Sequence, residues 1–413
     1  MMLLLLLKAW ILTSGVSMAS VAVLLVLLYM FLRKPLQTVL TNYELDKILG
    51  FNRDSFDRLV VCSKCNCVRK LSDCVVTVTR DGRRVTTVGR CSCVHFRKHP
   101  HKSKRTMCNA KLCHTTDRKF GLPRVSPVLS MPYRPLLAPL ARLLQTPGFE
   151  NQLEQWRVRF ASRGADDPIS DIHDGQLWRD MQSFNGAPLL AAAGTIAMCM
   201  WGDWIQPFVT ASYSMGVIMM VVGNLPRSVR FKRQNVILVQ LLPGGSEKVD
   251  CQALLRPLAE DLLALRNGVN IATHKHPGGR QIRVILFQCL ADAPGIRKLL
   301  AFVGITATCG CYRCTVQFPP VSSGSESKSG VAPKRNFFTD FDNLSPSRTR
   351  EQLFDAAKRY RKAKSPSERK EIAKETGSKD CVFLMLDYFN PVRASPIGAM
   401  HNLWEGTAKV CVH

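Results

Sequence analysis

The order of apolar segments between residues 196 and 292 most constrains how this chain can fold. Two strand-like apolar runs, at 196–202 and 283–291, end directly before Asp203 and Asp292. Between them lie two more strand-like runs and one amphipathic, helix-like stretch, at 213–223, 235–242 and 252–266. The sequence therefore predicts an α/β core in the order strand, strand, strand, helix, strand.

Asp203 and Asp292 are the candidate chemical groups of this core. Carboxylates at one end of neighbouring strands can share divalent ions such as Mg²⁺ or Mn²⁺, which prefer oxygen ligands. Such ions activate a water or a hydroxyl for in-line attack on a phosphodiester and stabilise the leaving oxygen. The alternative is a helix cap, and it is strongest for Asp292, which comes just before a predicted helix start.

The charge of the chain points to a polyanionic partner. The 413 residues contain 57 Lys+Arg against 31 Asp+Glu, a formal net charge of +26. Nucleic acid is the expected partner, because neutralising phosphates releases counterions and supplies sequence-independent affinity. A basic globular protein of the ribosomal kind is the alternative. We also predict a basic strip beside the core that contacts DNA phosphates, with a solvated surface as the alternative: Arg227, Arg230, Lys232 and Arg233.

Half of the 16 cysteines fall between residues 62 and 113, inside a basic segment. Their close spacing favours metal ligation in a reducing compartment over a disulfide framework. Cys62 and Cys65 form a CxxC knuckle, and an alternating segment with Asp81-Gly82 at its centre predicts a hairpin after it. Cys91 and Cys108 would complete a tetrahedral Zn²⁺ site. Other ligands remain available at Cys67, Cys93, Cys113, His99 and His101, and buried thiols without a metal are the alternative.

Two further features leave alternatives open. Cys309, Cys311 and Cys314 either bind a metal with a distant fourth ligand or pack as apolar groups. Residues 9–32 carry no charge and are long enough to cross a bilayer, but small and polar residues interrupt them, so a buried helical hairpin is the alternative. A cysteine-rich basic module suits the nucleus, and the membrane is the alternative location.

Composition divides the chain into four segments. The charged stretch within the last segment is expected to be helical at 346–376, and the connecting segment contains a predicted helix at 148–162. Residues 1–56 form an apolar and amphipathic helical part, and 57–120 a Cys/His-rich zinc-binding module. Residues 121–180 form a connecting helical region, and 181–413 an incomplete core with a charged insertion at about 319–380.

Several long sequence blocks resemble the transposases of CACTA-type (En/Spm) DNA transposons, especially their fungal branch. The core blocks are DWIQPF (203–208), YSMGVIMMVVGNLPRSVRFKRQNVILVQLLPG (213–244), ADAPGIRKLLAFVGITATCGCYRC (291–314) and YFNPVRASPIGAMHNLWEGTAKV (388–410). VCSKCNCVRKL, CSCVHFRKHPHKSKRTMCNAKL, GFENQLEQWRVRF and ISDIHDGQLWRDM precede them in the expected order. Fungal relatives also carry an apolar helical segment ahead of the cysteines, which weakens the membrane interpretation.

The resemblance implies an RNase H-like (DDE-type) core that cuts and joins DNA at transposon ends with Mg²⁺ or Mn²⁺, and it allows a homo-oligomer. Asp203 would be the first metal ligand and Asp292 the second. The third acid departs from the family, because the position two before the Met-His pair is Gly398. Glu405, one helical turn after His401, is the nearby substitute. We therefore expect a truncated transposase core that binds DNA without cutting it. An active enzyme, which needs a third carboxylate within reach of Asp203 and Asp292, and a membrane-anchored basic protein without nuclease activity are the alternatives.

Overall fold

The computed structural model describes residues 56–80, 83–97, 99–116, 123–164, 166–210, 213–244, 251–319 and 343–398. The chain divides into two compact units, 1–56 and 57–413. The expectations for residues 9–32 and for Glu405 fall outside the described residues. Within the described part, no helix has both the length and the apolar character needed to cross a membrane.

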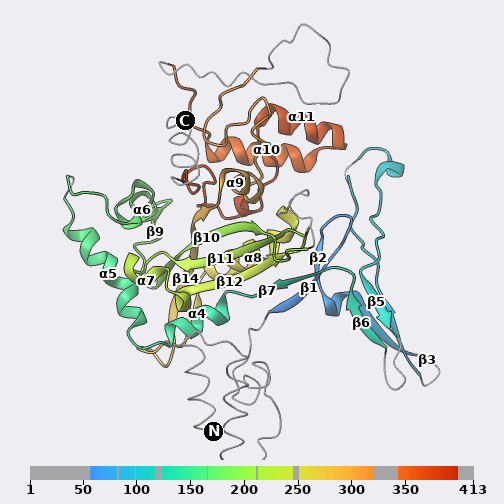
Figure 1. Cartoon of the computed structure of the whole chain (residues 1–413), viewed down its shortest axis with the longest axis horizontal. Coiled ribbons are helices and arrows are strands. Elements are labelled where there is room, and N and C mark those ends of the chain that lie inside the picture. Colours follow the sequence, from blue (N-terminus) through green and yellow to red (C-terminus); the bar gives the residue numbers. More distant parts are fainter. Residues whose placement is uncertain are drawn as a thin grey trace, which may run out of the picture. The chain divides into compact units, whose positions relative to one another are not determined.

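An eight-stranded sheet forms the centre of the larger unit (Figure 1). Strands β10 and β14, next to the β13 edge, run parallel, and the other neighbouring strands are antiparallel. In spatial order the strands are β13 (Val269–Ile271), β14 (Arg280–Leu290), β10 (Thr195–Ile205), β11 (Met215–Val222), β12 (Val236–Leu242), β7 (Ser130–Tyr133), β1 (Asp57–Val61) and β2 (Val68–Lys70).

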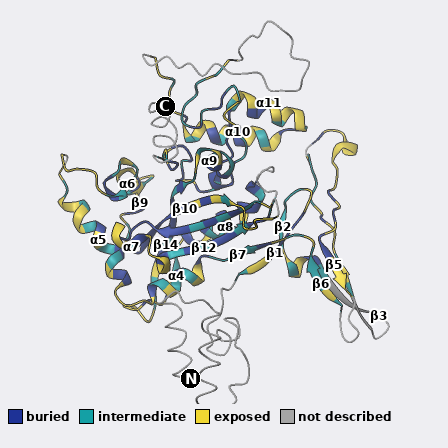
Figure 2. Ribbon diagram, in the orientation of Figure 1, coloured by how far each residue is buried: buried dark blue, intermediate teal, exposed yellow. Residues whose placement is uncertain are grey.

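The sequence of β10 explains its central place. Its first six residues are all buried, which fits a strand covered on both faces (Figure 2). After Met200 the pattern changes, so that Trp201, Asp203 and Ile205 are exposed while Gly202 is buried. The strand therefore leaves the core two residues before Asp203 and presents alternate side chains to solvent.

Helix α8 (Gln252–Arg266) connects β12 to β14 and packs against β14. Its leucines at 254, 255, 258, 262 and 265 are buried, with the spacing of one helix face. The expected order of strand, strand, strand, helix and strand is thus present as β10, β11, β12, α8 and β14. The short strand β13, which precedes β14 and pairs with it, was not predicted.

The remaining helices agree in part with the sequence expectations. The helix expected at 148–162 is α5 (Phe149–Ser162), and the charged region contains α10 (Arg350–Lys362) and α11 (Pro366–Thr376). Thr349 and Ser365 cap the N-termini of α10 and α11. The shorter helices are α4 (Leu137–Leu144), α6 (Gln176–Asp180), α7 (Arg227–Arg230) and α9 (Ala293–Leu299).

The cysteine-rich segment begins at the edge of the same sheet, with β1 and β2. Two hairpins follow, β3 (Val75–Arg80) with β4 (Arg83–Val88), and β5 (Cys113–Thr116) with β6 (Arg124–Pro127). Arg80 pairs with Arg83, as the hairpin predicted around Asp81-Gly82 requires, although these two residues themselves are not described. A small core of mostly cysteine side chains fills this region.

Candidate metal centres

Asp203 and Asp292 lie at the same end of the two parallel strands. Trp201 of β10 pairs with Leu290 of β14, and each aspartate follows two residues later. Neighbouring strands are about 4.8 Å apart, so the backbone brings the two carboxylates to one edge of the sheet. The juxtaposition expected from the sequence is therefore present in the backbone.

Each aspartate is exposed and uses one oxygen locally. Oδ1 of Asp203 accepts a hydrogen bond from the Trp204 N–H (2.7 Å), and Oδ1 of Asp292 accepts one from the Gly295 N–H (2.6 Å). Asp292 is the N-cap of α9, so the capping role weighed from the sequence is real. In the described part of the chain, neither Oδ2 has a protein hydrogen-bond partner, which leaves one oxygen of each carboxylate available for a cation.

Close packing of α9 on β10 fixes the geometry of this edge. A Cβ atom on Gly202 would lie 2.6 Å from Cδ1 of Leu299, so a larger residue at 202 would require the Leu299 side chain to shift. Two residues on, the Trp204 ring packs beneath Lys298, whose Nζ lies 4.6 Å from the ring centroid. Residues 202 and 204 thus anchor the helix that follows Asp292, while Asp203 points to the other face of the strand.

The described residues supply no third acid at this edge. Among them, the only group of three or more side chains arranged to hold a metal ion is made of cysteines. The third ligand expected at Glu405 lies outside the described residues. At Gly398 a Cβ would have no heavy atom within 4 Å, so a larger side chain has room there.

The expected basic strip does not form a single phosphate-binding surface. Arg230 is 3% exposed, and its guanidinium donates to both carboxylate oxygens of Asp171 (2.8 and 3.0 Å) and to the Leu225 carbonyl oxygen. It has no nitrogen left for DNA, which corrects the sequence expectation for this residue. Arg227, Lys232 and Arg233 are exposed.

The strip also lies at the opposite end of the sheet from the aspartates. Val217 of β11 pairs with Asp203, and β11 continues from there to Val222 before the strip begins. At about 3.4 Å per residue, this part of the strand is roughly 17 Å long. The strip is therefore separate from the carboxylates, because the antiparallel hairpin carries the chain away from them.

Residues 169–181, which were assigned no individual roles from the sequence, bring three buried polar and aromatic side chains against the core: His173, Asp174 and Trp178. Burial lowers the pKa of His173, whose Nε2 lies 2.8 Å from the Gly223 carbonyl oxygen. The His173 ring centroid also lies 4.5 Å from that of Trp178, with the two rings tilted by 59°, and Trp178 packs edge-on against Phe287 of β14. Asp171 links the same segment to Arg230. The segment therefore holds the loop after β11 against the core. The pairing of Asp171 with Arg230 could not be predicted from the sequence, because the two residues are 59 positions apart.

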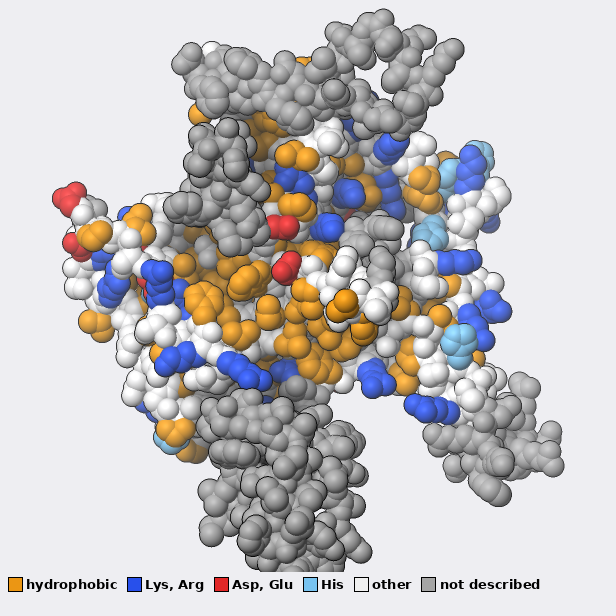
Figure 3. Space-filling model, in the orientation of Figure 1, with side chains coloured by type: hydrophobic (Ala, Val, Ile, Leu, Met, Phe, Trp, Pro, Cys, Tyr) orange, Lys and Arg blue, Asp and Glu red, His pale blue; other side chains and the backbone are white. Residues whose placement is uncertain are grey.

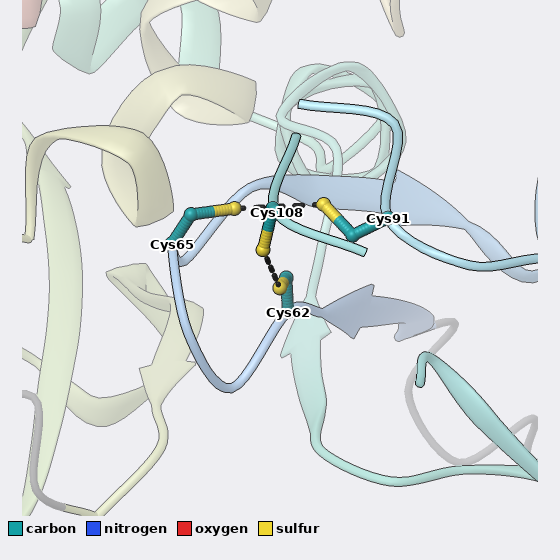
Figure 4. A group of neighbouring side chains, drawn as sticks. All are labelled: Cys62, Cys65, Cys91 and Cys108. Carbon is teal, nitrogen blue, oxygen red and sulfur yellow. Dashed lines mark hydrogen bonds between the residues drawn. The ribbon is translucent and has the colours of Figure 1, made fainter. Parts of the chain in front are cut away.

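The four cysteines predicted as metal ligands come together (Figure 4). Their sulfur atoms all lie within 4.8 Å of one another, with 3.5 Å between Cys62 and Cys108 and 3.5 Å between Cys65 and Cys91. Cys62 directly follows β1, in a tight turn in which the Asn66 N–H donates to the Cys62 carbonyl oxygen. Asn66 has φ 55°, a left-handed conformation that asparagine tolerates. This cluster could hold a metal ion.

Burial and backbone dipoles divide these thiols into different protonation states. Burial opposes ionisation of Cys62, but the backbone N–H groups of Cys65 and Lys64 outweigh it and lower its pKa to about 7. Burial raises the pKa of Cys91 to about 12 and that of Cys65 well above its usual range. A bound cation must therefore displace protons from these thiols, so metal affinity rises with pH.

The second cysteine group has structural partners. Cys309 Sγ donates to the Glu375 carbonyl oxygen (3.2 Å), and the Arg313 and Cys314 N–H groups donate to Cys311 Sγ at 3.4 Å. Arg348 donates to the carbonyl oxygens of Cys309 and Cys311. As far as the chain is described, these three thiols belong to no larger set of metal-binding side chains.

Hydrophobic side chains gather over the central strands on the face drawn in Figure 3. By alternation, Trp201 and Ile205 share the Asp203 side of β10, and both are more than 40% exposed. Phe208 and Tyr213, between β10 and β11, are also exposed, and their rings lie 5.9 Å apart. An aromatic surface of this kind marks an interaction site more often than an ordinary solvent-facing sheet does.

Comparison with known proteins identifies the class to which this fold and these sites belong. No curated protein matches the chain. A family model described as "Transposase family tnp2" matches residues 166–377. This match covers more than half of the chain and includes β10, β14, Asp203 and Asp292. The family acts on DNA, in agreement with the net charge of +26, and the chain is a member of the tnp2 transposase family.

Proposed function

We propose that this protein is a CACTA-type transposase whose RNase H-like core binds transposon ends in the nucleus. The observation that carries the proposal is the matched position of Asp203 and Asp292 at the same end of adjacent parallel strands, Asp203 within β10 and Asp292 just after β14, in a transposase-family domain. The strand order, with β14 beside β10 and α8 as the crossover, supports an RNase H-like core. The blocks shared with CACTA elements, including DWIQPF, favour that branch over other members of the family.

The residues at this edge fit Mg²⁺ or Mn²⁺. Exposed carboxylate oxygens without protein partners are hard ligands, which these ions prefer. Bound ions would lower the pKa of an attacking water or hydroxyl and neutralise charge on the phosphate. Asp203 and Asp292 would position the ions, and the hydrogen bonds from Trp204 and Gly295 would orient both carboxylates. The exposed rings of Trp201 and Phe208 offer stacking surfaces for bases beside the scissile phosphate.

We further propose that cleavage by this chain is weak or absent. Gly398 stands where relatives of the CACTA type have an acidic residue, and two carboxylates bind a catalytic metal pair poorly. Glu405 is the candidate replacement. DNA binding does not depend on the third acid, because it uses the overall positive charge and the exposed cations of the cysteine module and of the strip.

The cysteine cluster fits a structural Zn²⁺. A tetrahedral ion with Zn–S bonds of about 2.3 Å requires sulfur atoms about 3.8 Å apart. The observed spacing, from 3.5 Å to at most 4.8 Å, is close to that value. We propose Cys62, Cys65, Cys91 and Cys108 as the ligands of an ion that joins the turn after β1 to the residues directly following the bridged residues Arg90 and Met107.

Calorimetric titration of Mn²⁺ into the zinc-loaded protein tests the core of the proposal. The wild type should bind Mn²⁺, and the Asp203→Asn/Asp292→Asn double variant should not, while both bind DNA equally at low Mn²⁺. No Mn²⁺ binding by the wild type would reject the metal site. Metal-dependent nicking of transposon-end DNA that Asp203→Asn abolishes would instead overturn the inactive interpretation.

A further inference from the structure

A basic loop, residues 95–105, extends from the cysteine module toward α11 (Figure 1). It contains five Lys and Arg and no Asp or Glu. The bridge between Val94 and Met107 closes its base, and directly outside this bridge the Cys108 N–H donates to the Cys93 carbonyl oxygen at 2.8 Å. The basic loop therefore leaves the module at a defined point beside the cysteine cluster.

Hydrogen bonds within the basic loop hold its shape. The His99 N–H donates to the Phe96 carbonyl oxygen (2.8 Å), and Nε of Arg105 donates to the His99 carbonyl oxygen (2.7 Å). The described cations of this loop are exposed, and none forms an ion pair with a described carboxylate: Arg97, Lys102, Lys104 and Arg105. The loop thus presents unpaired positive charges from an ordered backbone.

One arginine of α11 joins the basic loop to the helices of the charged region. The guanidinium carbon of Arg369 lies 4.8 Å from the centroid of the Phe96 ring and 5.3 Å from that of the Tyr360 ring. Phe96 belongs to the loop and Tyr360 to α10, so a single cation contacts three elements. Phe96 has φ 49°, a conformation that a bulky residue rarely adopts without support from its contacts.

The same arginine has no acidic partner. Among the described residues Arg369 forms no ion pair, and its buried Nε has no hydrogen-bond partner. Stacking on ring faces leaves the N–H groups at the edge of a guanidinium available, and these groups match the oxygens of a phosphate in pairs. Arg230 shows the contrast, because both carboxylate oxygens of Asp171 accept its hydrogen bonds.

Helices α10 and α11 add further cations. Residues 350–376 contain nine Lys and Arg against five Asp and Glu. Glu375 and Asp380 are used by ion pairs with Arg359 and Arg361. The exposed lysines of this region form no ion pair within the described chain: Lys358, Lys362, Lys364, Lys370 and Lys374. Two of them, Lys370 and Lys374, lie one helical turn apart on α11.

This charged surface fits phosphates and not bases. Like charges gathered on one surface repel one another, and a polyanion relieves that repulsion. In the described parts of the basic loop and of α10 and α11, no large hydrophobic side chain is exposed, so there is no ring on which an unpaired base could stack. The bases of a duplex are already stacked inside it, and its phosphates face outward.

We propose that the basic loop, α10 and α11 form one surface that binds the phosphate backbone of duplex DNA, with Arg369 as its central contact. This inference rests on the DNA binding proposed above and assigns it to a place on the molecule. Because the contacts are to phosphates, binding at this surface is independent of sequence.

Salt-dependent titration of a random-sequence DNA duplex into the full zinc-loaded chain tests the proposal. Lys102→Gln/Lys104→Gln in the loop and Lys370→Gln/Lys374→Gln in α11 should each weaken binding. Each double variant should also reduce the slope of log affinity against log salt by about 2, because two phosphate contacts are lost.

The matched control is Arg142→Gln/Lys275→Gln, which removes two exposed cations beside α4 and should leave affinity and slope unchanged. A loss in the control equal to that in the α11 variant would show an effect of net charge alone and reject the surface. No change in the α11 variant would also reject it. If the wild type does not bind the duplex, the proposed DNA binding itself fails. Tighter binding of an RNA duplex of the same length would assign the surface to RNA and overturn the proposal.

Arg369→Lys tests the central contact at constant charge. Lysine keeps the positive charge but lacks the planar, paired donors of arginine, so duplex affinity should fall about tenfold. Zinc content and unfolding temperature equal to those of the wild type would show that the variant folds. Wild-type affinity in Arg369→Lys would remove Arg369 from the contact.

Discussion

Asp203 in β10 and Asp292 just after β14 occupy matching positions, each two residues beyond the paired residues Trp201 and Leu290 of these parallel strands. This relationship does not depend on the conformation of loops that are distant in the sequence. It follows from the register of two buried strands, each of which reaches solvent at the same level. Substitutions at these aspartates can therefore separate capping, metal binding and folding.

Asp292 is expected to have two separable roles. Asparagine can still accept the hydrogen bond from the Gly295 N–H, so Asp292→Asn should keep the stability of the wild type and lose Mn²⁺ binding. Asp292→Ala should lose Mn²⁺ binding and also about 1 kcal/mol of unfolding free energy. Urea denaturation and Mn²⁺ calorimetry measure the two effects. Equal Mn²⁺ affinity in wild type and Asp292→Asn would assign this residue to capping alone.

Restoring an acid at residue 398 should strengthen metal binding. The position has room for a side chain, because a Cβ would contact no heavy atom within 4 Å. We expect Gly398→Asp to raise Mn²⁺ affinity at least tenfold, about 1.4 kcal/mol. Gly398→Asn is the matched control, since it adds the same bulk without the charge. If both variants bind Mn²⁺ like the wild type, residue 398 is not the missing ligand.

Two arginines of one short segment should behave in opposite ways. Arg230→Gln breaks a buried ion pair with Asp171 and should cost about 3 kcal/mol of stability. Arg233→Gln should leave stability unchanged, because Arg233 is exposed, and should weaken DNA binding while reducing the slope of log affinity against log salt by about 1. Thermal unfolding and salt-dependent DNA titrations measure the contrast. An unchanged salt slope in Arg233→Gln would remove this residue from the DNA-binding surface.

His173 should make stability depend on pH below neutrality. Burial lowers its pKa in the folded state below the 6.5 of a free side chain. The unfolded chain then binds the proton more readily, so stability is complete above pH 6.5 and falls as the pH drops toward the folded pKa. The unfolding free energy of wild type and His173→Gln, compared from pH 7.5 to 5, should converge as the pH falls. Parallel curves would show that His173 does not cause the decline.

The sequence predicted those parts of the molecule that depend on local periodicity or spacing. The apolar runs of β10 and β14, the buried face of α8 and the convergence of Cys62, Cys65, Cys91 and Cys108 were all accessible in this way. The partners of Arg230 were not, because a run of arginines and a lysine resembles a solvated surface until Asp171 is placed beside it. The extension of the sheet by β7, β1 and β2 was also missed, since these short strands become strands only through pairing.

The junction of β7 with β12 determines whether the cysteine module can be separated from the core. β7 meets β12 at Tyr133 and Gln240, and Asp261 of α8 accepts hydrogen bonds from Tyr133 Oη (3.0 Å) and the Leu136 N–H (2.7 Å). β7 pairs with β1, and Cys62 directly follows β1. The start of the cysteine module is therefore attached, through β7, to the crossover helix α8 of the core. Exchange of this module for one from another protein would succeed only if the donor brought its own matching edge strand.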